Sequence, residues 1–286
     1  MIFSDECFRC LITRVEFECR LVSHDDVHIE STVRACEALL RTLWQEECPA
    51  PETASRIHRL ACRLIGSADP YARLKQANND DALAVLRLVA PSLTTFRDLC
   101  LGAVIANTLD YGSRAHHVTD DLAGFFAREF ASGFTIDHTP RIERHAARVV
   151  YLADNCGEIV FDRPVVNYLK DQGAHVTFVV RGGPILNDAT LDDAFRLGFD
   201  TLADLLTVNA RGGVSELGVN PALFPADLAE ALDRATIIIS KGMANYESLI
   251  TIKDLPPVAY LMSVKCDPIA RSVGAPTGSK IAMLAE

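Results

Sequence analysis

The second half of the chain alternates short apolar, β-branched runs with stretches of helical periodicity, and this alternation constrains the fold more than any other feature. Each run is almost continuously apolar, which is typical of a parallel strand covered on both faces. The runs lie at 148–153, 175–180, 205–208, 236–240 and 258–264. Helical stretches at 158–170, 188–197 and 225–234 separate them. The pattern predicts a doubly wound, mostly parallel α/β domain.

The first half of the chain has a helical pattern instead. Residues 29–46 and 52–66 place apolar side chains at three- and four-residue spacing, and Gly66 suits a helix end. A longer periodic region at 80–109 is interrupted at Pro91. Because strand signals are weak throughout this half, the sequence predicts a bundle of helices.

Length and composition are consistent with two folded units. The chain has 286 residues, which is longer than a single typical core needs, and 49% of them are hydrophobic. Residues 132–142 contain Gly and Pro and resemble a connection. We therefore expect an all-helical domain at 1–140 and an α/β catalytic domain at 141–286.

Charge and hydropathy restrict the partners. Lys and Arg number 28 against 38 Asp and Glu, so the net charge of −10 argues against nucleic acid, which requires a basic surface. A small phosphorylated substrate is compatible, because a metal ion and local cations can offset its charge. We expect no membrane partner, since no apolar run reaches the roughly 18 residues that span a bilayer. The acidic N-terminus lacks signal-peptide features, which predicts a cytoplasmic location.

Polar, charged and glycine-bearing segments follow four of the five predicted strands. In open α/β sheets, ligands bind beyond the carboxyl ends of the strands, so these segments should meet at one edge. They are Asp154–Glu158, Arg181–Asp188, Lys241–Glu247 and Lys265–Pro268.

The oxygen-bearing side chains among them favour a metal site. Asp154, Asn155 and Asp188 offer hard ligands that suit Mg²⁺ or Mn²⁺. Such an ion can polarise a phosphoryl oxygen and activate a water molecule. Either Glu158 or Asp188 could orient or deprotonate that water.

The same segments contain groups that suit a phosphate. Gly157, Gly182 and Gly242 leave room for backbone N–H groups to approach an anion at the start of a helix. Lys241 and Lys265 could neutralise phosphate oxygens. Taken singly, an Asp-Asn pair after a strand is more often a cap or a turn. It is the coincidence of these segments at one edge that favours a site. Neither a dinucleotide-binding G-x-G-x-x-G after the first strand nor a Walker motif occurs.

Motifs in both halves resemble the damage-control phosphatase family, in the order expected for that family. In the second half they are LADNCGEIVFD (152–162), VVRGGPILNDAT (179–190), SKGMANYESL (240–249) and SVKCDPIA (263–270). In the first half they are CFRC (7–10), SADPYARLKQANND (67–80) and IANTLDYGS (105–113). The Cys-x-x-Cys resembles the subfamily found mainly in archaea and bacteria.

This resemblance implies a helical N-terminal domain on a Rossmann-like α/β domain, and hydrolysis of a small phosphorylated metabolite such as a sugar phosphate, a nucleotide or a damaged metabolite. It implies Mn²⁺, Co²⁺, Ni²⁺ or Mg²⁺ as the cofactor. The implied metal ligands are Asp154, Asn155 and Asp188. The expected substrate-binding residues are Glu158, Arg181, Lys241, Gly242, Asn245 and Lys265.

One segment departs from the family pattern. The family often has Gly-Asn before its Asp-Phe/Tyr-Gly stretch, where this chain has Ala106-Asn107. We therefore expect Asn107 and Asp110 to line the pocket at most, without a catalytic role.

Two alternatives to a phosphatase stay open from the sequence. The first is a carboxyl methyltransferase that uses S-adenosylmethionine. Its ribose site would need an acidic residue at the end of the second strand, where Arg181 stands. The second is a metal-binding protein without turnover.

Overall fold

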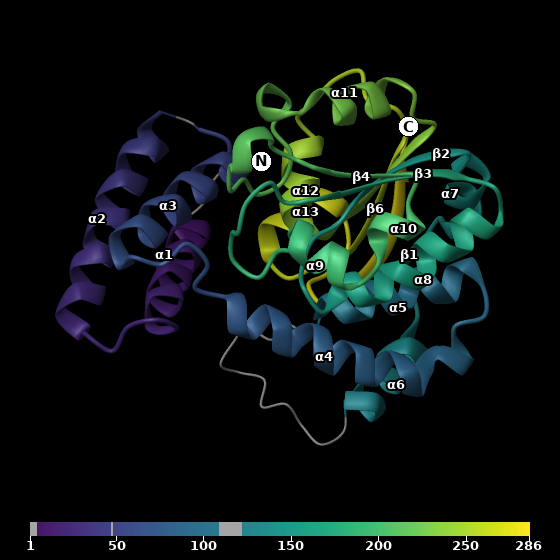
Figure 1. Cartoon of the computed structure of the whole chain (residues 1–286), viewed down its shortest axis with the longest axis horizontal. Coiled ribbons are helices and arrows are strands. Elements are labelled where there is room, and N and C mark those ends of the chain that lie inside the picture. The colour runs from purple at the N-terminus through teal and green to yellow at the C-terminus, as the bar shows by residue number, and fades with distance from the viewer. Residues whose placement is uncertain (1–4, 47, 109–121) are drawn as a thin grey trace.

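The computed structural model describes residues 5–46, 48–108 and 122–286. Within these ranges, seven strands form one sheet with helices on both faces (Figure 1). The strands are β1 (Ile136–Asp137), β2 (Arg148–Leu152), β3 (His175–Val180), β4 (Leu205–Val208), β5 (Ile237–Lys241), β6 (Val258–Ser263) and β7 (Lys280–Ala285). Over the same residues, no helix combines the length and apolarity that crossing a bilayer requires.

The first half of the chain is helical, as predicted, and helices alternate with strands in the second half. Those before the sheet are α1 (Asp5–Arg20), α2 (Asp26–Gln45), α3 (Ala50–Ile65), α4 (Ala72–Val89), α5 (Phe96–Thr108) and α6 (Leu122–Ser132). Those between the strands are α7 (Thr139–His145), α8 (Glu158–Asp171), α9 (Leu191–Arg196), α10 (Phe199–Leu202), α11 (Ala226–Asp233), α12 (Gly242–Leu249) and α13 (Asp267–Val273).

The predicted α/β class is confirmed. The strand order is β1-β7-β6-β5-β2-β3-β4, and every pairing except β6 with β7 is parallel. The chain runs outward from β2 through β3 to β4 and then returns to place β5 on the other side of β2. This reversal makes the gap between β2 and β5 the topological switch point, where ligands of open α/β sheets bind.

Two features of the sheet were not expected from the sequence. Strand β7 lies antiparallel beside β6, and the two-residue β1 pairs with β7 in parallel.

The start of one helix also differs from the prediction. Helix α9 begins at Leu191 rather than at residue 188, because Thr190 and Asp193 form a capping box that fixes its start.

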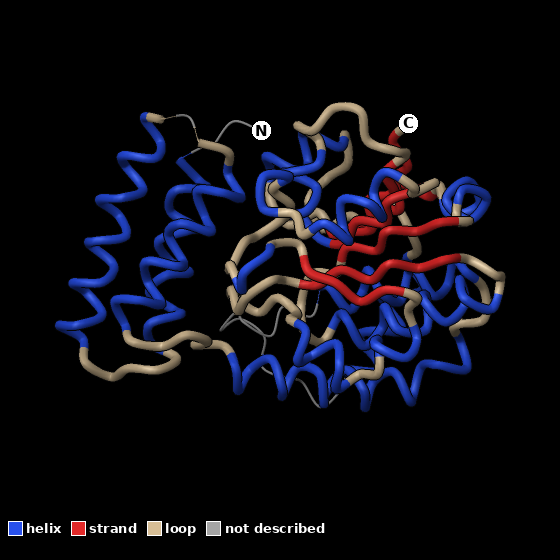
Figure 2. The backbone as a smooth tube through the Cα atoms, turned by 45° about the horizontal axis from the view of Figure 1, so that its top comes forward, coloured by secondary structure: helices blue, strands red, loops and turns tan. Residues whose placement is uncertain are grey.

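Three hydrophobic cores hold the fold together. Helices α1, α2 and α3 enclose a core of their own, built around Val15, Leu40 and Ile57. Helices α4, α5, α6 and α8 instead share one core with a face of the sheet, and α11, α12 and α13 cover the other face (Figures 1 and 2). The boundary near residue 140 stays a prediction. The cores themselves group α4–α6 with the sheet and leave α1–α3 as a separate cluster.

Helix α3 is tied to a loop of the α/β part by polar contacts. Arg59 Nη1 donates to the carbonyl oxygen of Ser215 at 2.6 Å and to Glu216. The backbone N–H of Leu217 donates to Ser55 Oγ at 2.8 Å. These contacts hold the α1–α3 cluster against the edge of the sheet at which the strands end.

Candidate active site

A pocket of about 140 Å³ opens at the carboxyl ends of the strands, beside the switch point. It is lined from the loops after β2, β3 and β6, from the start of α12, and from helices α1 and α5. Its polar lining includes Asn107, Asp154, Asn155, Asn187, Asp188 and Lys265. The pocket therefore contains all three of the metal ligands expected from the sequence.

Backbone pairing between two loops brings these residues together. Asn155 and Asp188 form an isolated antiparallel bridge, and the N–H of Ala189 donates to the carbonyl oxygen of Asp154 at 2.8 Å. The N–H of Cys156 donates to the carbonyl oxygen of Asn187, also at 2.8 Å. The segments after β2 and β3 thus form one rigid ledge at the floor of the pocket.

Arg181 holds the two aspartates from beneath. Its Nη2 lies 3.1 Å from Asp154 Oδ1 and its Nε lies 2.6 Å from Asp188 Oδ2. Its Nη1 donates to Asn245 Oδ1 and to the carbonyl oxygen of Gly218, each at 2.9 Å. Because Arg181 is only 2% exposed and does not line the pocket, its contacts are those of a clamp under the site.

Burial makes ionisation of the aspartate pair costly. Burial, together with the charges of Asp188 and Glu158, raises the pKa of Asp154 to about 8, while Arg181 and Lys265 oppose the change. Burial also raises the pKa of Asp188. Perturbed carboxylates in a pocket are candidates for function.

The donor set suits a hard divalent cation. Asp154 and Asp188 are buried carboxylates that face one pocket, and the amide of Asn155 lies beside them. Oxygen ligands of this kind suit Mg²⁺ or Mn²⁺. Among the described residues, no group of three or more His, Cys, Asp or Glu is arranged to hold a metal, so any such site depends on the amide or on water. The ligand roles stay predictions.

Gly242 lets the backbone at the start of α12 lie closer to Asp154 than a residue with a side chain would allow. Its φ is +71°, and a Cβ built on it would lie 1.9 Å from Asp154 Oδ2. Asn245, which is fully buried, donates from Nδ2 to the carbonyl oxygens of Ala153 at 3.1 Å and Lys241 at 2.7 Å. The first turn of α12 is therefore locked against the end of β2, where it supports Asp154.

Lys241 lies outside the pocket, although we expected it to bind substrate. Its side chain is fully buried, with Nζ 2.6 Å from Asp162 Oδ1 and in contact with Glu158. Burial alone disfavours its charge, but the two carboxylates outweigh this effect and raise the pKa of Lys241. Glu158 is likewise fully buried. Both side chains lie behind the site, whereas Lys265 lines the pocket as expected.

Asn107 contributes more to the site than we expected. Its Nδ2 lies 3.3 Å from Asp154 Oδ2 and also donates to Glu158 Oε2, so it connects the pocket with the buried carboxylates. The available signal was a single amide in the otherwise apolar second half of α5. Asp110 lies outside the described residues.

Two further asparagines on α4 were not singled out from the sequence. The N–H of Gly157 donates to Asn79 Oδ1 at 2.6 Å, and Asn78 Nδ2 donates to Asn187 Oδ1 at 2.9 Å. These bonds hold both loops of the ledge from the side of α4. The available signal was a pair of adjacent asparagines on a helix. By itself, such a pair does not show whether the side chains face solvent or contact another part of the protein.

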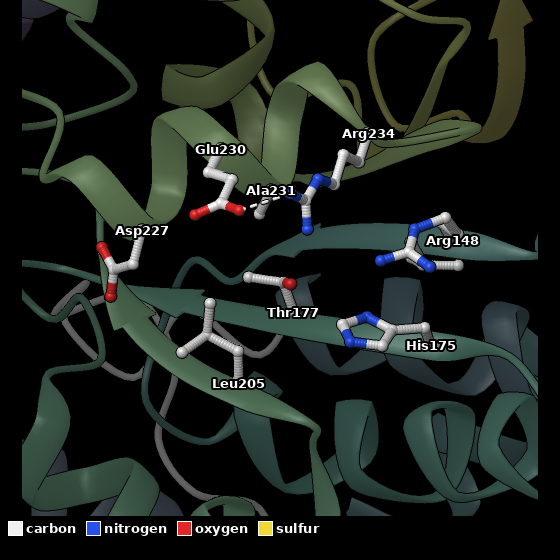
Figure 3. Close-up of a pocket in the computed structure, with 9 residues that line it drawn as sticks. Arg148, His175, Thr177, Leu205, Asp227, Glu230, Ala231 and Arg234 are labelled. Carbon is white, nitrogen blue, oxygen red and sulfur yellow. Dashed lines mark ion pairs between the residues drawn. The ribbon is translucent and has the colours of Figure 1, made fainter.

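A second pocket, of about 210 Å³, lies at the opposite, amino ends of the strands. Figure 3 shows Arg148 and His175 at the starts of β2 and β3, facing Glu230 of α11 and Arg234, which directly follows that helix. Arg234 Nη2 is already paired with Glu230 Oε1 at 2.6 Å, and all four side chains are exposed. Its groups are thus those of a solvated surface groove.

Comparison with known proteins agrees with this geometry. Residues 3–281 match the family model described as the damage-control phosphatase ARMT1-like domain. A damage-control phosphatase of Archaeoglobus fulgidus is 36% identical over 100% of both chains. A damage-control phosphatase of Pyrococcus horikoshii is 25% identical over 97% of this chain and 96% of its own length.

A solved structure shows the same fold. The crystal structure of a DUF89 family protein from Pyrococcus horikoshii matches 100% of both chains with a TM-score of 0.91 and 24% identity. At this identity the likeness concerns the fold alone, whereas the family model and the Archaeoglobus relative concern the sequence over nearly its whole length. The chain therefore belongs to the damage-control phosphatase family with an ARMT1-like domain.

Proposed function

We propose that this protein is a divalent-metal-dependent phosphatase that hydrolyses a small phosphorylated metabolite, such as a sugar phosphate, a nucleotide or a damaged metabolite. The observation that carries the proposal is the convergence of the Asp154 and Asp188 carboxylates in one pocket at the switch point, with Lys265 in the same lining. Membership of a phosphatase family supports the reaction class.

Asp154, Asn155 and Asp188 would hold the metal ion, which we expect to be Mn²⁺, Co²⁺, Ni²⁺ or Mg²⁺. When bound, such an ion polarises the phosphoryl group and lowers the pKa of a water molecule. Cation binding would also relieve the repulsion between the two buried carboxylates, since an added positive charge favours their ionised forms. The raised pKa of Asp154 supports this proposal, because a bound cation would offset the cost of ionising the buried carboxyl group.

The residues of the chain would bind and orient the substrate. Lys265 would neutralise phosphate oxygens, and the backbone at Gly242–Asn245 would face the phosphate at the start of α12. Of the two carboxylates considered for the attacking water, Asp188 lines the pocket, and Glu158 lies behind it. In the reaction, the ester P–O bond breaks, water supplies the new oxygen on phosphorus, and the released alcohol oxygen takes a proton.

The test is hydrolysis of para-nitrophenyl phosphate with each of the four metals. The Asp154→Asn variant should lose activity by about 10³-fold or more, since it removes a charged ligand of the ion. Asp233→Asn, an exposed aspartate at the end of α11, is the matched control and should keep the wild-type rate. A folded Asp154→Asn protein with the wild-type rate would show that the site is assigned wrongly.

Thermal shifts separate this proposal from the two alternatives. Stabilisation by Mn²⁺ that depends on Asp154 supports a metal site, because a ligand stabilises the state that binds it. Stabilisation by S-adenosylmethionine without metal would favour a methyltransferase. A metal-dependent shift without hydrolysis of any phosphate ester would favour a binding protein.

A further inference from the structure

One cation of the pocket comes from outside the α/β part. Arg14 lies on α1, in the separate α1–α3 cluster, yet it lines the same pocket as Asp154 and Lys265. Its side chain is exposed, whereas Lys265 is half-buried and its charge acts on Asp154. The pocket thus has an inner cation beside the aspartates and an outer cation on its helical wall.

Apolar side chains make up much of the wall that accompanies these cations. Tyr71, which is 2% exposed, lines the pocket together with Leu186, Leu217 and Met243. Ligand sites typically combine such apolar lining with a few polar groups that fix the orientation of the ligand. In this pocket the outer polar group is a guanidinium rather than a hydroxyl or an amide.

The chemistry of that guanidinium indicates what it binds. Its five N–H donors form a rigid fork that matches a carboxylate or a phosphate in a bidentate geometry, and the carboxylate is the smaller of these two anions. Five donors also allow Arg14 to keep a contact within the protein while it binds a ligand. An arginine on the outer wall therefore favours a phosphate ester with a second anionic group over one whose remainder is uncharged.

The volume of the pocket limits the rest of the substrate. About 140 Å³ is below the roughly 300–1,000 Å³ that is usual for drug-sized ligands, which favours a compound smaller than a nucleotide. We propose that Arg14 binds a carboxylate at the far end of the substrate, so that the preferred substrates are short phosphorylated carboxylic acids. This inference rests on the proposed phosphatase function.

The test compares two three-carbon phosphate esters, 3-phosphoglycerate and glycerol 3-phosphate, which differ in the distal carboxylate. Wild-type protein should favour 3-phosphoglycerate in kcat/KM by about tenfold or more, the scale expected when a charged hydrogen-bond partner is present or absent. Arg14→Gln should abolish that preference, mainly by raising KM for 3-phosphoglycerate. Arg14→Lys should keep part of it, since it retains the charge but loses the fork.

Arg9→Gln is the matched control, because Arg9 is an exposed arginine of the same helix that does not line this pocket. It should leave both substrates unchanged. The inference is overturned if the wild type shows no preference for the carboxylate, or if Arg14→Gln slows both substrates equally. Fructose 1,6-bisphosphate in place of 3-phosphoglycerate tests whether the second anion is a phosphate instead of a carboxylate. If Arg14→Gln reduces kcat/KM more for fructose 1,6-bisphosphate than for 3-phosphoglycerate, the assignment of a carboxylate is also contradicted.

The failure of this inference can be distinguished from that of the proposed function. If the wild type hydrolyses para-nitrophenyl phosphate but does not distinguish the two three-carbon esters, only the role of Arg14 is wrong. If it hydrolyses none of these compounds with any of the four metals, the proposed function is wrong and the inference falls with it.

Discussion

Two buried ion clusters lie on either side of Asn107, and they differ in what they face. The open cluster consists of Asp154, Asp188 and Arg181, and its two aspartates line the pocket. The closed cluster consists of Glu158, Asp162 and Lys241, each fully buried, with Tyr151 donating to Asp162 at 2.6 Å. Both pair one cation with two carboxylates, so composition does not distinguish them.

The difference between the clusters lies in where their uncompensated charge is exposed. In the closed cluster, Lys241 lies between its carboxylates, and burial raises the pKa of Asp162 to about 6 against the opposing effect of Lys241. In the open cluster, Arg181 likewise stands against two carboxylates, but these face a pocket, where Lys265 or a ligand can supply further positive charge. An ion cluster that is sealed from solvent stabilises or positions, while one beside a cavity can bind.

The largest expected effect concerns the open cluster. Asp188→Asn should lower kcat/KM by on the order of 10³-fold, because it would remove one of the proposed charged metal ligands from a buried site. It should also abolish the thermal shift caused by Mn²⁺, while the metal-free protein stays folded. Hydrolysis assays and melting curves with and without metal check this. A variant that retains the metal-induced shift would place the ion elsewhere.

The closed cluster should respond in stability instead. Lys241→Met leaves two carboxylates without their cation, which should cost about 3–5 kcal/mol of unfolding free energy. Urea denaturation measures this loss. Adding Glu158→Gln and Asp162→Asn to Lys241→Met should recover part of it, because the unpaired charges are then gone. An unchanged urea midpoint for Lys241→Met would show that the closed cluster does not differ from the open one through an effect on stability.

A substitution at Gly242 should have an effect of intermediate size on activity, and the chain offers a matched glycine as its control. Gly242→Ala should lower kcat/KM by about 10²-fold, since its methyl group would displace Asp154 by a distance that matters for catalysis. Gly274→Ala is the matched control, with a φ of +69° but nothing within 4 Å of the added Cβ. Both variants should lose about 1 kcal/mol of stability from the left-handed backbone, and only the first should lose activity. Equal activity in the two variants would contradict the close approach at Asp154.

The last prediction is a pH dependence of the metal-free protein, a gradual change rather than a loss of activity. Because the pKa of Asp154 is raised to about 8, the folded state holds a proton that the unfolded state releases nearer pH 4. The stability contributed by this group is complete below about pH 4 and is lost as pH rises towards about 8, by at most about 1.4 kcal/mol per pH unit.

Urea denaturation in chelator at about pH 5.5, 7 and 8.5 would measure this slope, and Asp154→Asn should flatten it. Metal affinity should change in the opposite direction and increase with pH over the same range, because the ion displaces the proton. If wild type and variant have equal slopes, Asp154 is already ionised in the metal-free protein.

The sequence by itself determined strands β2 to β6 and the edge of the sheet at which the candidate site lies. Strands β2 to β6 were predictable because a buried parallel strand is a continuous apolar run, which is a local pattern. Once those strands are parallel, their carboxyl ends must meet, so Asp154, Asn155 and Asp188 could be brought together from chain order alone. Lys265 was found by the same reasoning.

Only the tertiary structure decided which polar groups face the pocket. Lys241 ends a strand as Asp154 follows one, but packing buries the lysine against Glu158 and Asp162. Asn107 is 47 residues from Asp154 along the chain, and the partner of Asn79 is 78 residues away, distances at which no local pattern signals a contact. Arg14 reaches the pocket because the α1–α3 cluster docks on this edge of the sheet, and docking depends on surfaces that form only once each part has folded.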